Sequence, residues 1–76
     1  MPQRYRFNTV FTIQPGSGFI VTNLRIQVNG VTFESGTTIH PGLTFGGINI
    51  YNYIGQDVAG EWNTQSRTLV FRGFYT

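Results

Sequence analysis

The 76-residue sequence contains no cysteine and no lysine. Without cysteine the chain can form no disulfide, no zinc–thiolate site and no thiol nucleophile. No apolar run approaches the roughly 18 residues that a membrane helix requires, and residues 1–6 lack the apolar stretch of a signal peptide. We therefore expect no membrane partner and no such leader in this sequence, and the compartment is left open.

A single small domain covering residues 1–76 is the expected organisation. A chain of this length buries only about 60% of the surface of its unfolded form, and neither disulfides nor a recognisable metal site add stability here. Association between subunits is the remaining common source of stability. The sequence therefore predicts that the chain partners with itself as a homo-oligomer.

The composition favours strands over helices. Ten Gly and three Pro accompany 39% hydrophobic and 16% aromatic residues, and Thr, Asn, Val, Ile and Phe are frequent. Such residues are poor helix formers and are common in strands and turns. The predicted fold is an all-β, small antiparallel barrel or sandwich of five to six strands.

Alternation with period two predicts three strands, over residues 4–13, 19–28 and 67–75. Pro15-Gly16-Ser17-Gly18 predicts a turn between the first two. Residues 55–63 contain two glycines and two of the three acids, which indicates a loop with one helical turn at most. The last strand has aromatic residues on both faces, with Leu69, Phe71 and Tyr75 on one and Val70, Arg72 and Phe74 on the other. This pattern predicts a central or interfacial strand.

Asn29-Gly30 is the strongest local signal in the chain, because both central residues of a type I′ turn need positive φ. A two-residue turn at this point brings two apolar pairs and one pair of opposite charge into register. The predicted pairs are Val28 with Val31, Ile26 with Phe33, and Arg25 with Glu34.

A glycine also recurs about every six residues, at positions 30, 36, 42 and 47. One interpretation is a β-solenoid or an intertwined fibre strand. The other is a meander of short strands with a Gly turn about every six residues. We favour the meander, because the residue before each glycine is not aliphatic.

Catalytic and metal chemistry find little support in the sequence. His40 is the single histidine, and no serine stands in a nucleophile-elbow motif. Glu34, Asp57 and Glu61 are the only acids, and their spacing is not typical of metal ligands. We therefore expect no enzyme, no metal and no cofactor.

Arg and aromatic residues cluster at both ends of the chain, and two interpretations of them stay open. In the first, an Arg-aromatic surface captures a nucleotide or a single-stranded nucleic acid, since Arg holds phosphates and rings stack on bases. Its candidate residues are Arg4, Arg6, Arg67, Arg72, Tyr5, Phe74 and Trp62. In the second, the rings are core or subunit contacts. Its candidate self-association residues are Phe7, Phe11, Phe71, Phe74 and Tyr75.

Trp62 permits further interpretations, as a saccharide platform beside Tyr51 and Tyr53, as an interface anchor or as a lid over a barrel end. The overall character of the chain, which is small and rich in Gly, Thr, Asn and aromatics, resembles that of compact phage-encoded β proteins. The leading hypothesis is a non-enzymatic, self-assembling structural protein, such as a viral or appendage component. The alternative is the small nucleotide-binding protein described above.

Overall fold

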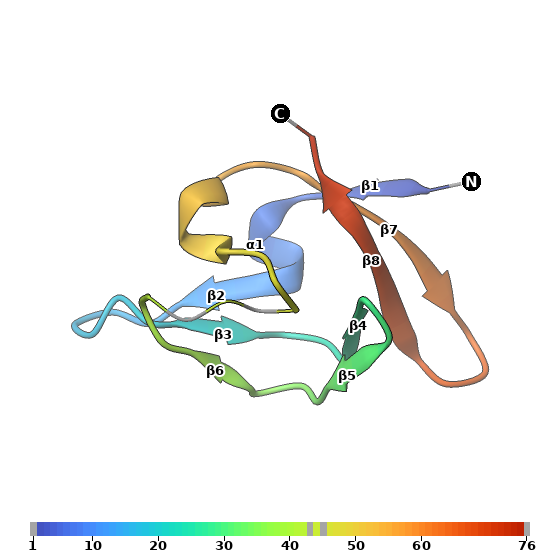
Figure 1. The fold of residues 1–76 in the computed structure, drawn as a ribbon, viewed down its shortest axis with the longest axis horizontal. Coiled ribbons are helices and arrows are strands. Elements are labelled where there is room, and N and C mark those ends of the chain that lie inside the picture. Colours follow the sequence, from blue (N-terminus) through green and yellow to red (C-terminus); the bar gives the residue numbers. More distant parts are fainter. Residues whose placement is uncertain (1, 43, 45, 76) are drawn as a thin grey trace.

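The computed structural model describes residues 2–42, 44 and 46–75. Strands form most of the regular structure, with one turn of α-helix and one of 3₁₀-helix (Figure 1). In chain order the elements are β1 (Gln3–Tyr5), α1 (Phe7–Val10), β2 (Phe11–Ile13), β3 (Ile20–Thr22), β4 (Ile26–Val28), β5 (Val31–Phe33), β6 (Thr38–Ile39), η1 (Ile50–Tyr53), β7 (Val58–Asn63) and β8 (Thr68–Phe74).

The strands form two sheets, which confirms the all-β class. One sheet has five strands in the order β1-β7-β8-β4-β5, and the other has three in the order β2-β3-β6. The two sheets do not close into a continuous barrel. Two details of the prediction are wrong: the described chain has more than six strands, and β4 pairs with β8 in parallel.

The hydrophobic core draws on both sheets and on both helical turns. Its largest fully buried side chains include Phe11 and Ile20 from the three-stranded sheet and Ile26 and Leu69 from the five-stranded sheet. Ile50 of η1 is also fully buried. Neither sheet therefore has a separate core, because the buried side chains of both belong to one cluster.

The predicted first strand, residues 4–13, is wrong in its middle, where α1 interrupts it. Phe7, Val10 and Phe11 are all buried, and this i, i+3, i+4 spacing fits one face of a helical turn. Asn23 stabilises the turn: its Nδ2 donates to the carbonyls of Asn8 at 3.0 Å and Thr9 at 3.3 Å. These are carbonyls that such a short helix cannot satisfy internally.

The predicted second strand, residues 19–28, is divided at residues 23–25 into β3 and β4. The chain leaves the three-stranded sheet at this point and enters the five-stranded sheet. The apolar face is nevertheless as predicted on both sides of the break, since Ile20, Thr22, Ile26 and Val28 are all buried. The turn after β2 is also confirmed, because β2 and β3 pair antiparallel across it.

The Asn29-Gly30 hairpin is confirmed with its register. Asn29 has φ 50° and Gly30 has φ 83°, and β4 pairs with β5 so that Val28 faces Val31 and Ile26 faces Phe33. The Asn29 side chain also donates to the carbonyl of Gly46 at 2.7 Å. The hairpin turn is therefore hydrogen-bonded to the later loop that contains Gly46.

Residues 55–63 contain strand β7, so the predicted loop is wrong over most of this range. Strand β7 contains Gly60 at a position where the neighbouring strand leaves no space for a side chain. A Cβ at this position would lie 2.8 Å from Leu69 Cδ1 and 3.0 Å from the Val70 carbonyl oxygen. This glycine reflects close packing on β8 and not a turn.

Strand β8 is central, as predicted, because β7 and β4 flank it. The predicted faces of its last residues are wrong, because the register with β7 shifts between Ala59 and Gly60. A β-bulge of this kind adds a residue to one strand and reverses the alternation beyond it. Phe74 therefore lies beside Phe71, with their ring centroids 5.2 Å apart.

The glycine-rich middle segment follows the favoured interpretation. The four glycines at positions 30, 36, 42 and 47 have φ between 83° and 86°, and short strands or turns lie between them. Two residues of this repeat, Leu43 and Phe45, lie outside the described residues.

Candidate interaction surfaces

The outer face of the five-stranded sheet holds all three carboxylates of the chain, each in an ion pair with an arginine. Arg25, Asp57 and Arg72 are next in sequence to buried residues of the strands, so their side chains point away from the core. The three pairs are Arg4 Nε to Asp57 Oδ2 at 2.7 Å, Arg25 Nε to Glu34 Oε1 at 3.1 Å, and Arg72 Nη2 to Glu61 Oε1 at 2.6 Å.

Each pair joins neighbouring segments of the sheet, and each is exposed. The Arg4 side chain is 63% exposed and the Glu34 side chain 67% exposed. Surface pairs of this kind contribute up to about 1 kcal/mol each. The Arg25–Glu34 pair predicted from the hairpin register is confirmed.

Arg72 also changes the acidity of Glu61. Its Nε donates to Glu61 Oε1 at 2.6 Å. This hydrogen bond and the positive charge of the guanidinium hold the pKa of the Glu61 carboxyl below its ordinary value.

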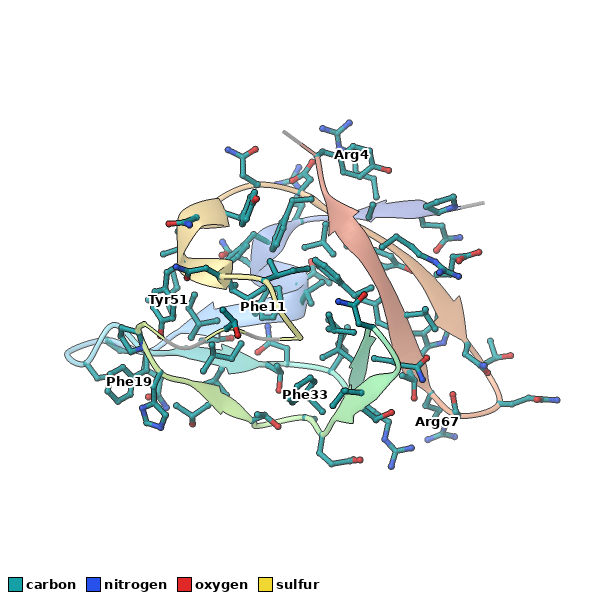
Figure 2. The ribbon with its side chains drawn as sticks, viewed as in Figure 1. Arg4, Phe11, Phe19, Phe33, Tyr51 and Arg67 are labelled. Carbon is teal, nitrogen blue, oxygen red and sulfur yellow. The ribbon has the colours of Figure 1, made fainter. Side chains whose placement is uncertain are left out.

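The candidate arginines for nucleotide binding do not form one basic patch. Arg4 and Arg72 are bound to carboxylates, whereas Arg6 and Arg67 make no ion pair within the described part of the chain. Arg67 lies in the β7–β8 turn and Arg4 at the opposite end of the sheet (Figure 2). Arg6 lies near Arg4, in the link between β1 and α1.

One Arg-aromatic contact does form where the two ends of the chain meet. The Arg4 guanidinium carbon lies 4.3 Å from the Tyr75 ring centroid, within the range of a cation–π interaction. Tyr5 packs against the core instead, and its hydroxyl donates to Gln3 Oε1 at 2.7 Å. The ring of Tyr75 is thus occupied by a neighbouring cation of the same chain.

Four of the five aromatic residues considered for self-association, all except Tyr75, form a cluster inside the chain. Phe7 is 3% exposed, Phe11 0% and Phe71 7%. Phe74 links them to η1, since its ring stacks on Tyr53 with centroids 4.5 Å apart and also lies 6.5 Å from Phe7. These side chains contact the chain's own core, as Figure 2 shows for Phe11.

Exposed large apolar side chains lie elsewhere, at Ile13, Val31, Ile54 and Trp62. Ile13 is 40% exposed and lies on β2, and Val31 is 52% exposed and lies on β5. Each of these strands is at the edge of its sheet. The sequence did not identify Ile13 or Val31 as exposed residues, because both are core positions in a period-two pattern.

Two shallow hollows are open to solvent. The larger, of about 470 Å³, is lined by residues 61–65 and Val70 at the β7–β8 hairpin. The smaller, of about 330 Å³, lies beside Arg6, Phe7, Asn8, Gly55 and Asp57. Trp62 lines the larger hollow, whereas Tyr51 and Tyr53 line neither of the two.

The described residues contain no cluster of three or more His, Asp or Glu that could hold a metal ion. His40 instead meets the Phe19 ring edge-to-face, with centroids 4.9 Å apart. None of the described helical segments has the length and apolar character needed to cross a membrane.

No protein-family model, curated protein sequence or solved structure matches this chain.

Proposed function

We propose that this chain is a non-enzymatic β module that associates with copies of itself. The observation that carries the proposal is the exposed apolar side chain of Val31, which lies on the edge strand β5. An edge strand presents unpaired backbone N–H and C=O groups, and an apolar edge is the kind of surface that a further strand covers. The narrower role, a structural component of a virion or appendage, rests on the composition.

The residues that carry this association differ from those suggested by the aromatic pattern. Phe7, Phe11 and Phe71 are needed inside the chain, so their replacement by charged residues would unfold it. Contacts between copies would instead use edge strands and the exposed side chains on them.

The charge distribution gives less support to nucleotide or nucleic-acid binding. Such binding depends on several basic side chains that are free to contact phosphates. Of the five arginines, three are already paired with the three carboxylates. The remaining two, Arg6 and Arg67, lie in separate parts of the chain.

The proposal is tested by light scattering after size exclusion, from micromolar to near-millimolar protein and in low and high salt. We expect a mass that rises with concentration and that survives high salt, because apolar strand contacts are weakly screened. A monomer under all conditions would contradict the proposal. Recording absorbance at 260 and 280 nm in the same runs tests the alternative, because salt-sensitive absorbance at 260 nm would indicate bound nucleic acid.

A further inference from the structure

The described chain has four edge strands, and three of them are protected against pairing with another copy. β1 carries Arg4 at its centre, so antiparallel pairing of two β1 strands would place two arginines opposite each other. Like charges in that position are unfavourable. β6 has two residues and is followed by His40 and Pro41, and proline removes a backbone donor.

The third protected edge is that of β2. Helix α1 precedes β2 directly, and the Phe11 amide donates to the Phe7 carbonyl. In Figure 1, α1 lies on the side of β2 away from β3. An incoming strand would meet the helical turn at that edge. Among the edge strands of the described residues, β5 is therefore the one with no charged residue at its centre, no proline directly after it and no helix adjoining it in sequence.

The hairpin register determines which backbone groups of β5 face outward. Val28 and Val31 flank a two-residue turn, and such a pair exchanges backbone hydrogen bonds within the hairpin. Hydrogen bonding alternates along an antiparallel pair, so Val31 and Phe33 bond to β4. The N–H and C=O groups of Thr32, between them, point to the free edge.

We propose that β5 pairs antiparallel with β5 of a second copy, about a two-fold axis at Thr32. This inference rests on the proposed function and assigns its contact. In this register the two Thr32 residues exchange both of their backbone hydrogen bonds. Val31 of each copy, 52% exposed in the single chain, then lies opposite Phe33 of the other copy.

The charges near β5 are compatible with this register. Glu34 would lie opposite Gly30 of the second copy, so the two glutamates do not face each other. Each Glu34 is also paired with Arg25 of its own chain, with both carboxylate oxygens 3.1 Å from Arg25 Nε. The pairing therefore brings no uncompensated like charges together.

The symmetry determines the size of the assembly. A two-fold contact uses the same strand on both copies and closes on itself. It joins the two five-stranded sheets into one continuous sheet, and both β5 edges are then paired. The expected product is a dimer and not a filament, with weak affinity because three residues on each side supply the strand contact.

The test compares Thr32→Lys with Thr38→Lys by light scattering over a concentration series. Both threonines are exposed and lie on edge strands, so both variants should fold, which circular dichroism checks. Thr32→Lys places two ammonium groups opposite each other at the two-fold axis, and we expect the dimer dissociation constant to rise by about tenfold or more. Thr38→Lys should leave it unchanged.

A crosslinking pair gives an independent measurement, because the natural chain has no cysteine. Paired residues at a hydrogen-bonded position have Cα atoms about 5.5 Å apart, which suits a disulfide. Thr32→Cys should therefore form a covalent dimer under mild oxidation at low concentration. Thr38→Cys should remain mostly monomeric under the same conditions.

The outcomes separate this inference from the proposed function. If the natural chain stays monomeric at every concentration and Thr32→Cys does not crosslink, both are wrong. If the natural chain associates while Thr32→Lys has no effect and Thr32→Cys does not crosslink, self-association stands and the β5 contact is wrong. An equal rise in the dimer dissociation constant for Thr32→Lys and Thr38→Lys would also overturn the β5 contact.

Discussion

Replacement of Tyr51 by phenylalanine should destabilise the fold through one hydroxyl group. The Tyr51 hydroxyl accepts a hydrogen bond from the Ile20 amide at 3.0 Å and donates to the Ile39 carbonyl. Ile20 on β3 and Ile39 on β6 face each other, and both are buried. The hydroxyl thus joins η1 to two strands of the three-stranded sheet (Figure 2).

The expected magnitude follows from what the substitution leaves behind. Tyr51→Phe keeps the ring, so apolar burial changes little, but an N–H group and a C=O group inside the protein each lose a partner. A buried polar group left without a partner costs about 1–3 kcal/mol. We expect the free energy of unfolding to fall by about 2 kcal/mol, and Tm to fall by about 10 °C for a domain of this size.

Urea denaturation monitored by the fluorescence of the single Trp62 gives the free energy of unfolding. Tyr53→Phe is the matched control: the Tyr53 hydroxyl makes no hydrogen bond within the described residues, and the Tyr53 ring stacks on Phe74. The control should change stability by less than about 0.5 kcal/mol. Equal stability of the two variants, or unchanged hydrogen-exchange protection of the Ile20 amide in Tyr51→Phe, would refute the reasoning.

Three further perturbations test other parts of the structure. Gly60→Ala should lower the free energy of unfolding by about 1–3 kcal/mol, because the new methyl group would lie 2.8 Å from Leu69 Cδ1. Urea denaturation measures this loss of stability, and unchanged stability would contradict the close packing of β7 on β8. Asn23→Ala should lower the free energy of unfolding by about 1 kcal/mol, because it removes the hydrogen bonds to the two α1 carbonyls. Circular dichroism should show a lower Tm, and an unchanged Tm would contradict the role of Asn23. Arg72 lowers the pKa of Glu61 in the folded chain, so the ionised Glu61 stabilises the fold. This contribution is complete above the ordinary glutamate pKa of about 4.3. It is lost as the pH falls from that value through the lower pKa of the folded chain. Glu61→Gln should therefore show a smaller loss of stability between pH 6 and pH 3, as measured by urea titration, and an identical pH profile would contradict the ion pair.

Local turn chemistry made one part of the fold predictable. Asn29 and Gly30 adopt positive φ at low cost, and a two-residue turn leaves a single register for the strands beside it. The positions of Val28, Val31 and the Arg25–Glu34 pair follow from that turn. All the information needed lies within ten residues of sequence.

The N-terminal segment shows where period-two reasoning fails. Phe7 and Phe11 fit both an alternating strand and a helical turn, because a spacing of four residues satisfies both periods. Only packing against the core, together with the bonds from Asn23 to the α1 carbonyls, selects the helical turn. Asn23 lies more than ten residues away from that helix, so no local pattern contains it.

The candidate binding residues could not be judged from the sequence for the same reason, because their partners lie far away in the chain. Arg4 and Arg72 stand beside aromatic residues in the sequence, and one of the two open interpretations was a binding surface made of these residues. In the fold, Asp57 and Glu61 lie beside these two arginines because β7 lies between β1 and β8. Strand β7 was itself missed, because Gly60 is typical of a loop unless the close approach of Leu69 is known.

The all-β class, the Asn29-Gly30 hairpin and the glycine turns could be predicted, because each depends on the conformational preferences of neighbouring residues. The parallel pairing of β4 with β8, the bulge that turns Phe74 toward the core, and the carboxylate partners of Arg4 and Arg72 could not. These features depend on residues far apart in the chain. Their energies arise when the strands meet, and no short segment carries them.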